Sequence, residues 1–508
     1  MLQDIIDSLY DDDLNRQLIL RDNNLRRVGN HEMSRSRRLC FLHNTVVKGQ
    51  EAMMNITLNF PLTMIVKRYY DLVYGTTLQS SFLVESEVKD VMRHLGWPAR
   101  KWDLHRSEDL SFLFCQCPNF NEDISDWDVS GVISMEYMFV FCKEFNQDLS
   151  RWNTSTVKIM SGMFFKATSF DSPLFQNVEN VVNFDRLFAD CHSFNQDISG
   201  WNTSNVNSMS NTFTRAHNFN QDIGGWNTGN VTCMKSMFKE ARRFNQDISN
   251  WDVSKVSIMA SMFQDAESFN CDLYRWDVSE RLSHVQSMFK NATSFNGMLY
   301  NPDECHTGGN QFELVKAKWC QSMFEGCINF NQLIPGEFAY ARDMSRMFYN
   351  ATSFNQEIVC LSDQCESFSK MFYNAINFNG DIHVEVDTFS IMRADLSYMF
   401  FNAKFFNKDI SNWIVTPDNS MANMFNGASS FNQNLNDWDF FGLSDYDDDD
   451  HINGIFVNCT SLDFEITHWD RKFNTRAENF DIYKYFAGSE TMLRRFYQWE
   501  EEQESDTD

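Results

Sequence analysis

The 508-residue sequence lacks the features that mark most membrane proteins, exported proteins and enzymes. No apolar run reaches the ~18 to 20 residues of a membrane span. The first seven residues carry acids where a signal peptide needs bases, so we expect a cytoplasmic protein. There is no glycine-rich phosphate loop, His-Glu-x-x-His pair or nucleophile elbow, and none of the 11 His recurs with a period. The sequence therefore predicts no enzymatic activity, no cofactor and no membrane insertion.

Basic charge is also scarce. The 43 Lys and Arg are outnumbered by 70 Asp and Glu, which gives a net charge of −27. The acids are concentrated at residues 11–13, 447–450 and 500–508. Such a chain repels polyanions and anionic membranes within a Debye length of ~10 Å, which excludes nucleic acid as a partner. The charge either keeps a Phe-rich body soluble or attracts a basic protein partner.

The 13 Cys do not indicate a disulfide framework or a metal site. Five occupy the small-residue position of the repeat described below, and Cys320 and Cys365 fall on other core positions. The pair Cys305-His306 lies with Cys320 and Cys327 in a zinc-like neighbourhood, but the repeat already explains two of these residues. We expect no metal and a mostly reduced chain.

What the sequence does contain is a repeat, typified by residues 237–251. A marker Phe returns mostly every 24 to 26 residues, and a second column six residues later holds Phe in every unit except the last, which has Leu462. Periods of this size predict an array whose units bury their apolar sides against their neighbours. The fourteen marker residues are Phe114, Phe139, Phe164, Phe188, Phe213, Phe238, Phe263, Phe289, Phe324, Phe348, Phe372, Phe400, Phe425 and Phe456.

Other columns predict the elements of each unit. Ala or Cys always stands three residues after the marker, which indicates a tightly packed position. Apolar residues seven, four and one positions earlier, such as Val256, Met259 and Met262, match one face of a short helix with Ser254 at its N-cap. The following Phe-Asn-x-Asp-Ile segment predicts a strand of a parallel sheet, with the Asn column as an internal ladder.

The pattern Val-x-x-Met-x-x-Met-Phe-x-x-Ala-x-x-Phe-Asn-Gln-Asp-Ile-Ser-x-Trp resembles the BspA-like leucine-rich-repeat family of bacterial surface-protein repeats. The resemblance covers residues 107 to 469. It implies a β/α repeat solenoid, that is, a leucine-rich-repeat-like right-handed superhelix of about 14 coils with parallel strands. It also implies protein recognition or adhesion. An intracellular protein-binding scaffold and a cell-surface adhesin are both compatible with the sequence.

Three regions are expected along the chain. Residues 1–106 form a helical region that either covers the open end of the array or acts as a separate recognition module. Residues 107–469 form the solenoid, and insertions at 300–311 and 445–450 are places for binding contacts. Residues 470–508 form a cap helix and a disordered acidic tail. The helix should cover 479–499, with a break at Gly488. Its predicted buried residues are Phe480, Tyr483, Phe486, Met492, Leu493 and Phe496.

One polar column is the candidate binding site. Three residues after the second Phe column, Asp stands in eight units and Glu in two. Its carboxylates either accept bonds from backbone N–H groups in the next turn, or present an acidic strip to a basic protein partner. The candidate strip consists of Asp123, Asp148, Asp197, Asp222, Asp247 and Asp272, and the other members of the column are Asp381, Asp409, Glu357 and Glu465.

Overall fold

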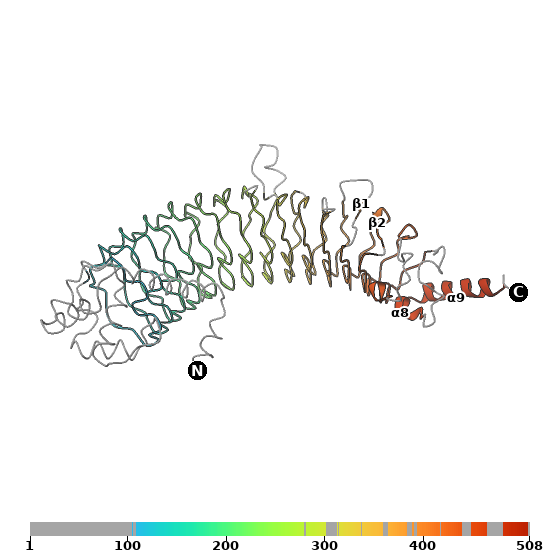
Figure 1. Cartoon of the computed structure of the whole chain (residues 1–508), viewed down its shortest axis with the longest axis horizontal. Coiled ribbons are helices and arrows are strands. Elements are labelled where there is room, and N and C mark those ends of the chain that lie inside the picture. The colour runs from blue at the N-terminus through green and yellow to red at the C-terminus, as the bar shows by residue number, and fades with distance from the viewer. Residues whose placement is uncertain are drawn as a thin grey trace, which may run out of the picture.

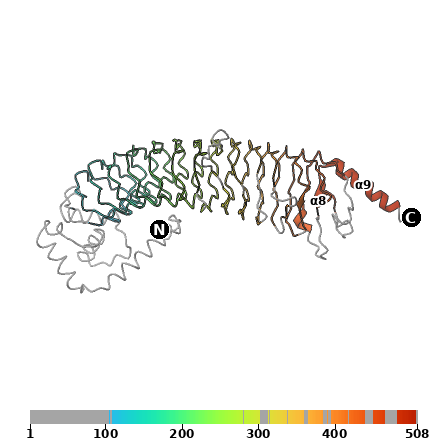
Figure 2. The same ribbon diagram turned by 90° about the horizontal axis from the view of Figure 1, so that it is seen from above.

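The computed structural model describes residues 104, 108–278, 281–300, 312, 314–336, 338–358, 364–383, 389–390, 394–416, 418–438, 449–464 and 481–505. In these ranges the repeats are successive coils that lie side by side along one elongated body (Figures 1 and 2). We number the coils 1 to 14 after their marker Phe and count positions from that residue, so Ala241 is at +3 of coil 6. The helical region expected at residues 1–106 lies outside the described residues, except for Leu104.

Neighbouring coils are joined through their backbones. Parallel bridges at position −5 link each coil to the next, from Asp109 in coil 1 to Ser420 in coil 13. In coil 6 the N–H groups at −4, −2, 0 and +2 donate to carbonyl oxygens of coil 7 at 2.7 to 2.9 Å, and Phe238 donates to Met262 in this series. Each coil is therefore the hydrogen-bonding template for the next one.

The segments that we expected to be helices are runs of turns. Within coil 6 the N–H of Met237 donates to the carbonyl of Met234, and the N–H of Lys239 to that of Ser236, both at 3.2 Å. Positions −2 and +2 have left-handed backbones, with φ of 54° at Ser236 and 57° at Glu240. A right-handed helix cannot pass through such residues, and half of the N–H groups it would need already bond to the next coil. The helix prediction for these segments was therefore wrong.

The predicted strand position also differs from the bridges. In the Phe-Asn-x-Asp-Ile segments the described residues show one isolated bridge, between Ile358 and Ile382, whereas the continuous series runs at −5. Two strands of two residues, β1 (Phe389–Ser390) and β2 (Trp413–Ile414), pair in parallel. A 3₁₀ helix, η3, covers Asp449–Ile452. A side-chain ladder, described below, takes the place of strand pairing in the Phe-Asn segments.

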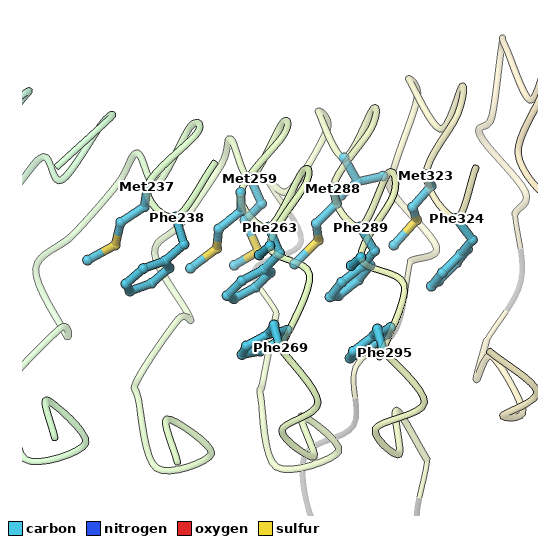
Figure 3. Close-up of a cluster of buried hydrophobic side chains, with 14 of the residues drawn as sticks. Met237, Phe238, Met259, Phe263, Phe269, Met288, Phe289, Phe295, Met323 and Phe324 are labelled. Carbon is cyan, nitrogen blue, oxygen red and sulfur yellow. The ribbon is translucent and has the colours of Figure 1, made fainter. Parts of the chain in front are cut away.

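The core is a continuous stack of rings. All fourteen marker Phe are fully buried. The ring centroid of Phe238 lies 5.6 Å from those of Phe213 and Phe263 in the adjacent coils, and 3.9 Å from that of Phe244 in the second column. Figure 3 shows the marker rings of successive coils in the same orientation, with Phe269 of the second column below. Each coil therefore buries its rings mainly against its two neighbours.

Polar groups in the core find partners one coil away. The Nε1–H of Trp251 donates to the Ile223 carbonyl at 3.1 Å, and the Trp of other coils repeat this bond. At position +3, the Cys327 thiol donates to the carbonyl of Phe289 at 2.8 Å. Ala and Cys at this position are fully buried in every coil. The prediction of a tightly packed small-residue column is confirmed.

The repeat continues beyond residue 469, where we expected it to end. The chain forms helix α8 (Tyr483–Phe486), turns at Gly488 with φ of 77°, and continues as α9 (Glu490–Ser505). Phe486 stacks on marker Phe456 at 5.4 Å, and the Ser489 hydroxyl donates to the Phe456 carbonyl at 2.8 Å. Phe486 and Ser489 thus occupy positions 0 and +3 of a fifteenth coil. The coil is built from helices, so its sequence lacks the Phe-Asn pattern that identifies the others.

Two further expectations about the C-terminal region need correction. Tyr483 is half exposed, while Met492, Leu493 and Phe496 are buried as predicted; Phe480 lies outside the described residues. Residues 500–505, expected to be disordered, belong to α9 because Glu and Gln are good helix formers and can stay on an exposed face. Figure 2 shows α9 leading away from the last coil. In the described part of the chain no helix is long and apolar enough to cross a membrane.

Candidate functional site

The predicted acidic strip falls into two parts. Asp197, Asp222, Asp247 and Asp272 occupy position +9 of consecutive coils 4 to 7, and the first three are exposed. Coil 3 has Pro173 at this position. It separates the four from the two remaining members of the strip, Asp123 and Asp148. The longest uninterrupted run of carboxylates in the strip is therefore four coils.

Carboxylates of the strip also accept hydrogen bonds that close turns. Oδ1 of Asp197 accepts the Ser199 N–H at 2.9 Å, Oδ1 of Asp247 accepts the Ser249 N–H at 2.9 Å, and the same bond recurs at Asp123, Asp148 and Asp222. Oδ1 of Asp272 instead accepts an N–H of the next coil at 2.8 Å. Hydrogen bonds from the side chain and backbone of Ser199 lower the pKa of Asp197, and those from the backbone and side chain of Ser249 lower the pKa of Asp247. These contacts favour the turn-forming interpretation, and binding by the strip stays a prediction.

A second polar column forms the ladder predicted from the Asn residues. Oδ1 of the Asn or Asp at +7 accepts the backbone N–H of the +7 residue in the next coil, as in the 2.8 Å bond from Asn245 to Asn220. The ladder lies mostly at the surface, whereas we expected it inside. Thirteen such bonds of 2.7 to 2.9 Å run from Asn121 through Asn146, Asp171, Asn195, Asn220, Asn245, Asn270, Asn296, Asn331, Asn355, Asn379, Asn407 and Asn432 to Asp463.

Positions −2, +1 and +2 point away from the core and differ in composition along the array. In coils 1 to 4 position +1 is apolar in every coil, and its residues form a second cluster with Tyr137 from position −2. The exposed fractions in this cluster are 2 to 6%: Cys115, Tyr137, Val140, Phe165 and Ala189. In coils 5 to 8 position +1 carries Thr214, Lys239, Gln264 and Lys290. The backbone therefore accommodates both polar and apolar residues at position +1.

Aromatic residues return at these positions in coils 10 to 12. Rings at +1 stack between coils, with centroids 4.7 Å apart for Tyr349 and Tyr373 and 4.6 Å apart for Tyr373 and Phe401. Tyr398, at −2 of coil 12, lies 5.7 Å from Phe401 and is tilted by 48°. We call these four residues the aromatic ridge. All four are half buried, and burial, together with Tyr349 and Tyr398, raises the pKa of Tyr373, which keeps its hydroxyl protonated.

Two cations accompany the ridge. The guanidinium of Arg346 lies 4.3 Å from the ring centroid of Tyr349, and the ammonium of Lys370 lies 5.3 Å from that of Tyr398. Arg346 also makes a bidentate pair with Glu325, at 2.7 and 3.0 Å. Burial raises the pKa of Glu325, but hydrogen bonds from Arg346 and other neighbours outweigh it and the net shift is downward. Glu325 is thus an anchored anion that holds Arg346 against the ridge.

Other clusters of titratable groups are less promising. The rings of His192 and His217 stack at 4.5 Å beside Asp190 and Arg215. Burial and His192 lower the pKa of His217, so this histidine stays neutral near pH 7. Within the described ranges no three His, Cys, Asp or Glu side chains are grouped to hold a metal ion.

The zinc-like neighbourhood considered above is only partly described. Cys320 and Cys327 are core residues whose thiol pKa values are raised by burial, and Cys305 and His306 lie outside the described residues. A buried thiol with a raised pKa is a poor metal ligand and a poor nucleophile.

Comparison with protein families matches the repeats. The family described as "Mycoplasma protein of unknown function, DUF285" matches in five overlapping segments, at residues 80–199, 182–302, 298–395, 362–469 and 384–499. The chain belongs to the DUF285 family. The overlapping matches show a repeat protein, and the last one extends through coil 15 of the structure. No curated protein matches this DUF285 chain.

The sequence pattern did not predict the aromatic ridge of this DUF285 protein. Its only signal is that Tyr349, Tyr373 and Phe401 each directly follow a marker Phe. They are 24 and 28 residues apart, and the periodicity of the far more numerous core Phe conceals them. Stacking between coils turns this weak signal into one contiguous surface.

Proposed function

We propose that this DUF285 chain is a non-enzymatic scaffold that binds a protein partner through the outward positions of its coils. The proposal is based mainly on one observation. Position −2 keeps φ between 52° and 61° through coils 1 to 13, while its side chain changes from Ser236 to Arg346 to Tyr398. A fixed backbone that carries different side chains in each coil is suited to recognition of an extended partner surface.

The acidic strip supports a basic partner. Asp197, Asp222 and Asp247 lie in line on consecutive coils, and the chain as a whole carries −27 charges. A partner with a row of Lys or Arg would associate fast and lose affinity with added salt. The strip therefore provides the electrostatic part of the proposed interaction.

We also propose that the array is a leucine-rich-repeat-like right-handed superhelix of the BspA-like kind. The repeat length, the regular columns and the parallel bridges between coils support this assignment. The turns in place of helices distinguish these coils from the β/α unit that the resemblance implies. If the assignment holds, a cell-surface adhesin is the alternative to a scaffold inside the cell.

The test is a binding experiment with the full chain. The chain, tagged and immobilised, is incubated with proteins of its source cells, and bound proteins are cross-linked and identified. We expect at least one protein that binds saturably, is displaced by free chain, and cross-links to the outward positions. Absence of any saturable protein partner would contradict the function. Labelling of the chain on intact cells by a membrane-impermeant reagent would favour the adhesin over the intracellular scaffold.

A further inference from the structure

We propose that the aromatic ridge, Tyr349, Tyr373, Tyr398 and Phe401 with Arg346 and Lys370 beside it, binds a protein segment that carries acidic and apolar side chains. This inference rests on the proposed function and names a surface and a partner chemistry for it. The ridge is separate from the acidic strip, which would attract the opposite charge.

Folding of the array does not require rings at these positions. Position +1 carries Thr214, Lys239 and Gln264 in coils with the same turns and the same bonds to the next coil. Apolar residues at this position in coils 1 to 4 are almost completely buried, whereas those of the ridge are only half buried. The ridge thus leaves part of its apolar surface to solvent in the described structure, and covering that surface would favour association.

The stacking decides which kind of ligand can use the ridge. Tyr373 lies between Tyr349 and Phe401 at 4.7 and 4.6 Å, so both of its faces are covered. Tyr349 is covered on its other side by Arg346 at 4.3 Å. Sugars and nucleobases bind aromatic residues mainly through the ring faces. The ridge offers mostly ring edges and hydroxyl groups, which suit the irregular surface of a polypeptide.

The electrostatics of the ridge favour an acidic segment. Aromatic ring edges carry partial positive charge, and protonated Tyr hydroxyls donate hydrogen bonds. Lys370 adds a full positive charge, and Glu325 is shared between Arg346 and Lys290, so this group of three also keeps one positive charge. Carboxylates and backbone carbonyls of a partner would therefore meet donors and positive potential, in a chain that is otherwise strongly acidic.

The test uses the full chain and a phage-displayed library of random 12-residue peptides. The ridge variant carries Tyr349→Thr, Tyr373→Gln and Phe401→Gln, residue types that position +1 accepts in coils 5 and 7. The control exchanges Lys239→Gln and Gln264→Lys at the same position of coils 6 and 7. Selection on the wild-type chain should enrich peptides with Asp or Glu among apolar residues. Their affinity should fall at least about tenfold in the ridge variant and stay unchanged in the control.

A second variant tests the ridge without changing its rings, so that weaker binding cannot result from misfolding of the ring stack. Lys370→Gln leaves the rings in place, and we expect it to weaken the same peptides several-fold and to reduce the salt dependence of binding. Any of three results would overturn the ridge proposal. The selection enriches basic peptides, the selected peptides bind the ridge variant as tightly as the wild type, or no peptide is enriched. If the wild-type chain bound maltohexaose and the ridge variant did not, the ligand of the ridge would be a sugar and not a protein segment. If a cellular protein binds the ridge variant as well as the wild type, the ridge proposal is wrong but the proposed scaffold function is not contradicted. The scaffold function is contradicted only if the wild-type chain captures no protein.

Discussion

At the scale of single residues, two left-handed positions in each coil restrict which side chains the array accepts. Positions −2 and +2 have φ near 57° in coil after coil, although most of them are not Gly. Asn and Gly occupy +2 from coil 8 onward, as expected for residues that tolerate this conformation. The earlier coils place Phe141, Lys166 and Arg215 there, which costs about 1 to 2 kcal/mol per residue.

Ser261, at −2 of coil 7 with φ of 57°, tests this restriction. Ser261→Val should lower the free energy of unfolding by about 1 to 2 kcal/mol, because a β-branched residue fits the left-handed region poorly. Ser261→Gly should change it by less than about 1 kcal/mol, since the relief of strain is offset by the greater freedom of the unfolded chain. Urea unfolding of both variants measures the difference, and equal stabilities would show that the turn is not strained.

At the scale of the element, each coil is held to its neighbour by side chains that imitate a strand. The Asn ladder supplies the acceptor that a neighbouring carbonyl would supply in a sheet, and the Asp column closes the turn that follows. Both devices use one carbonyl or carboxyl oxygen per coil. Asp can therefore replace Asn in the ladder, as Asp171 does, and Asn434 replaces Asp in the turn column.

Asn220 tests the ladder, because its Oδ1 accepts the Asn245 N–H at 2.8 Å. Asn220→Leu should cost about 0.5 to 1.5 kcal/mol of stability, since the N–H of Asn245 loses its acceptor. Asn220→Asp keeps an acceptor and serves as the matched control, with little change expected. The readout is again urea unfolding, with hydrogen exchange at the Asn245 amide as a local probe. A Leu variant as stable as the Asp variant would show that the ladder contributes nothing.

The acidic strip can be tested by paired substitutions of Asp197, Asp222, Asp247 and Asp272. Changing all four to Asn should preserve the fold, because Asn434 makes the same turn bond at 3.0 Å, and should abolish salt-sensitive binding if the strip is a site. Changing all four to Ala removes the acceptors and should cost about 0.5 kcal/mol at each position. If the Ala variant loses stability while binding by the Asn variant is unchanged, these carboxylates only form turns and are not a binding site.

The same variants predict a pH dependence. The folded-state pKa values of Asp197 and Asp247 are below the ordinary value of 3.8, so their stabilisation is present above pH 3.8 and is lost as pH falls through the lower folded values. The Asn variant cannot titrate at these positions. Its free energy of unfolding should therefore change less than that of the wild type between about pH 5 and about pH 2. Parallel pH profiles would contradict the assigned role of these carboxylates.

At the scale of the whole molecule, stability is a sum over coils and the contacts between adjacent coils. The ring stack runs from Phe114 through Phe456 to Phe486 in α8, so the helices at the C-terminal end complete the core as well as covering it. Because each ring touches mainly its neighbours, damage in the middle should divide the array into two halves.

Phe238→Ala makes such a break, since Phe238 is fully buried between Phe213 and Phe263. We expect a loss of about 3 to 5 kcal/mol and two separate thermal transitions in place of one. Lys239→Ala is the matched control, because position +1 lies outside the core. A single unchanged transition in the Phe238 variant would disprove the nearest-neighbour description.

By itself, the sequence determined the period, the buried columns and the small position at +3, because side chains that must pack against the next coil recur at fixed intervals. It also indicated the Asn ladder and the helix break at Gly488. The backbone conformation of each coil was decided by the tertiary structure. Residues such as Met234 and Met237 have helical spacing, but turns with left-handed residues bury the same positions once the N–H groups bond to a coil some 25 residues away. The fifteenth coil and the aromatic ridge likewise depend on contacts between coils, which no stretch of a single coil encodes.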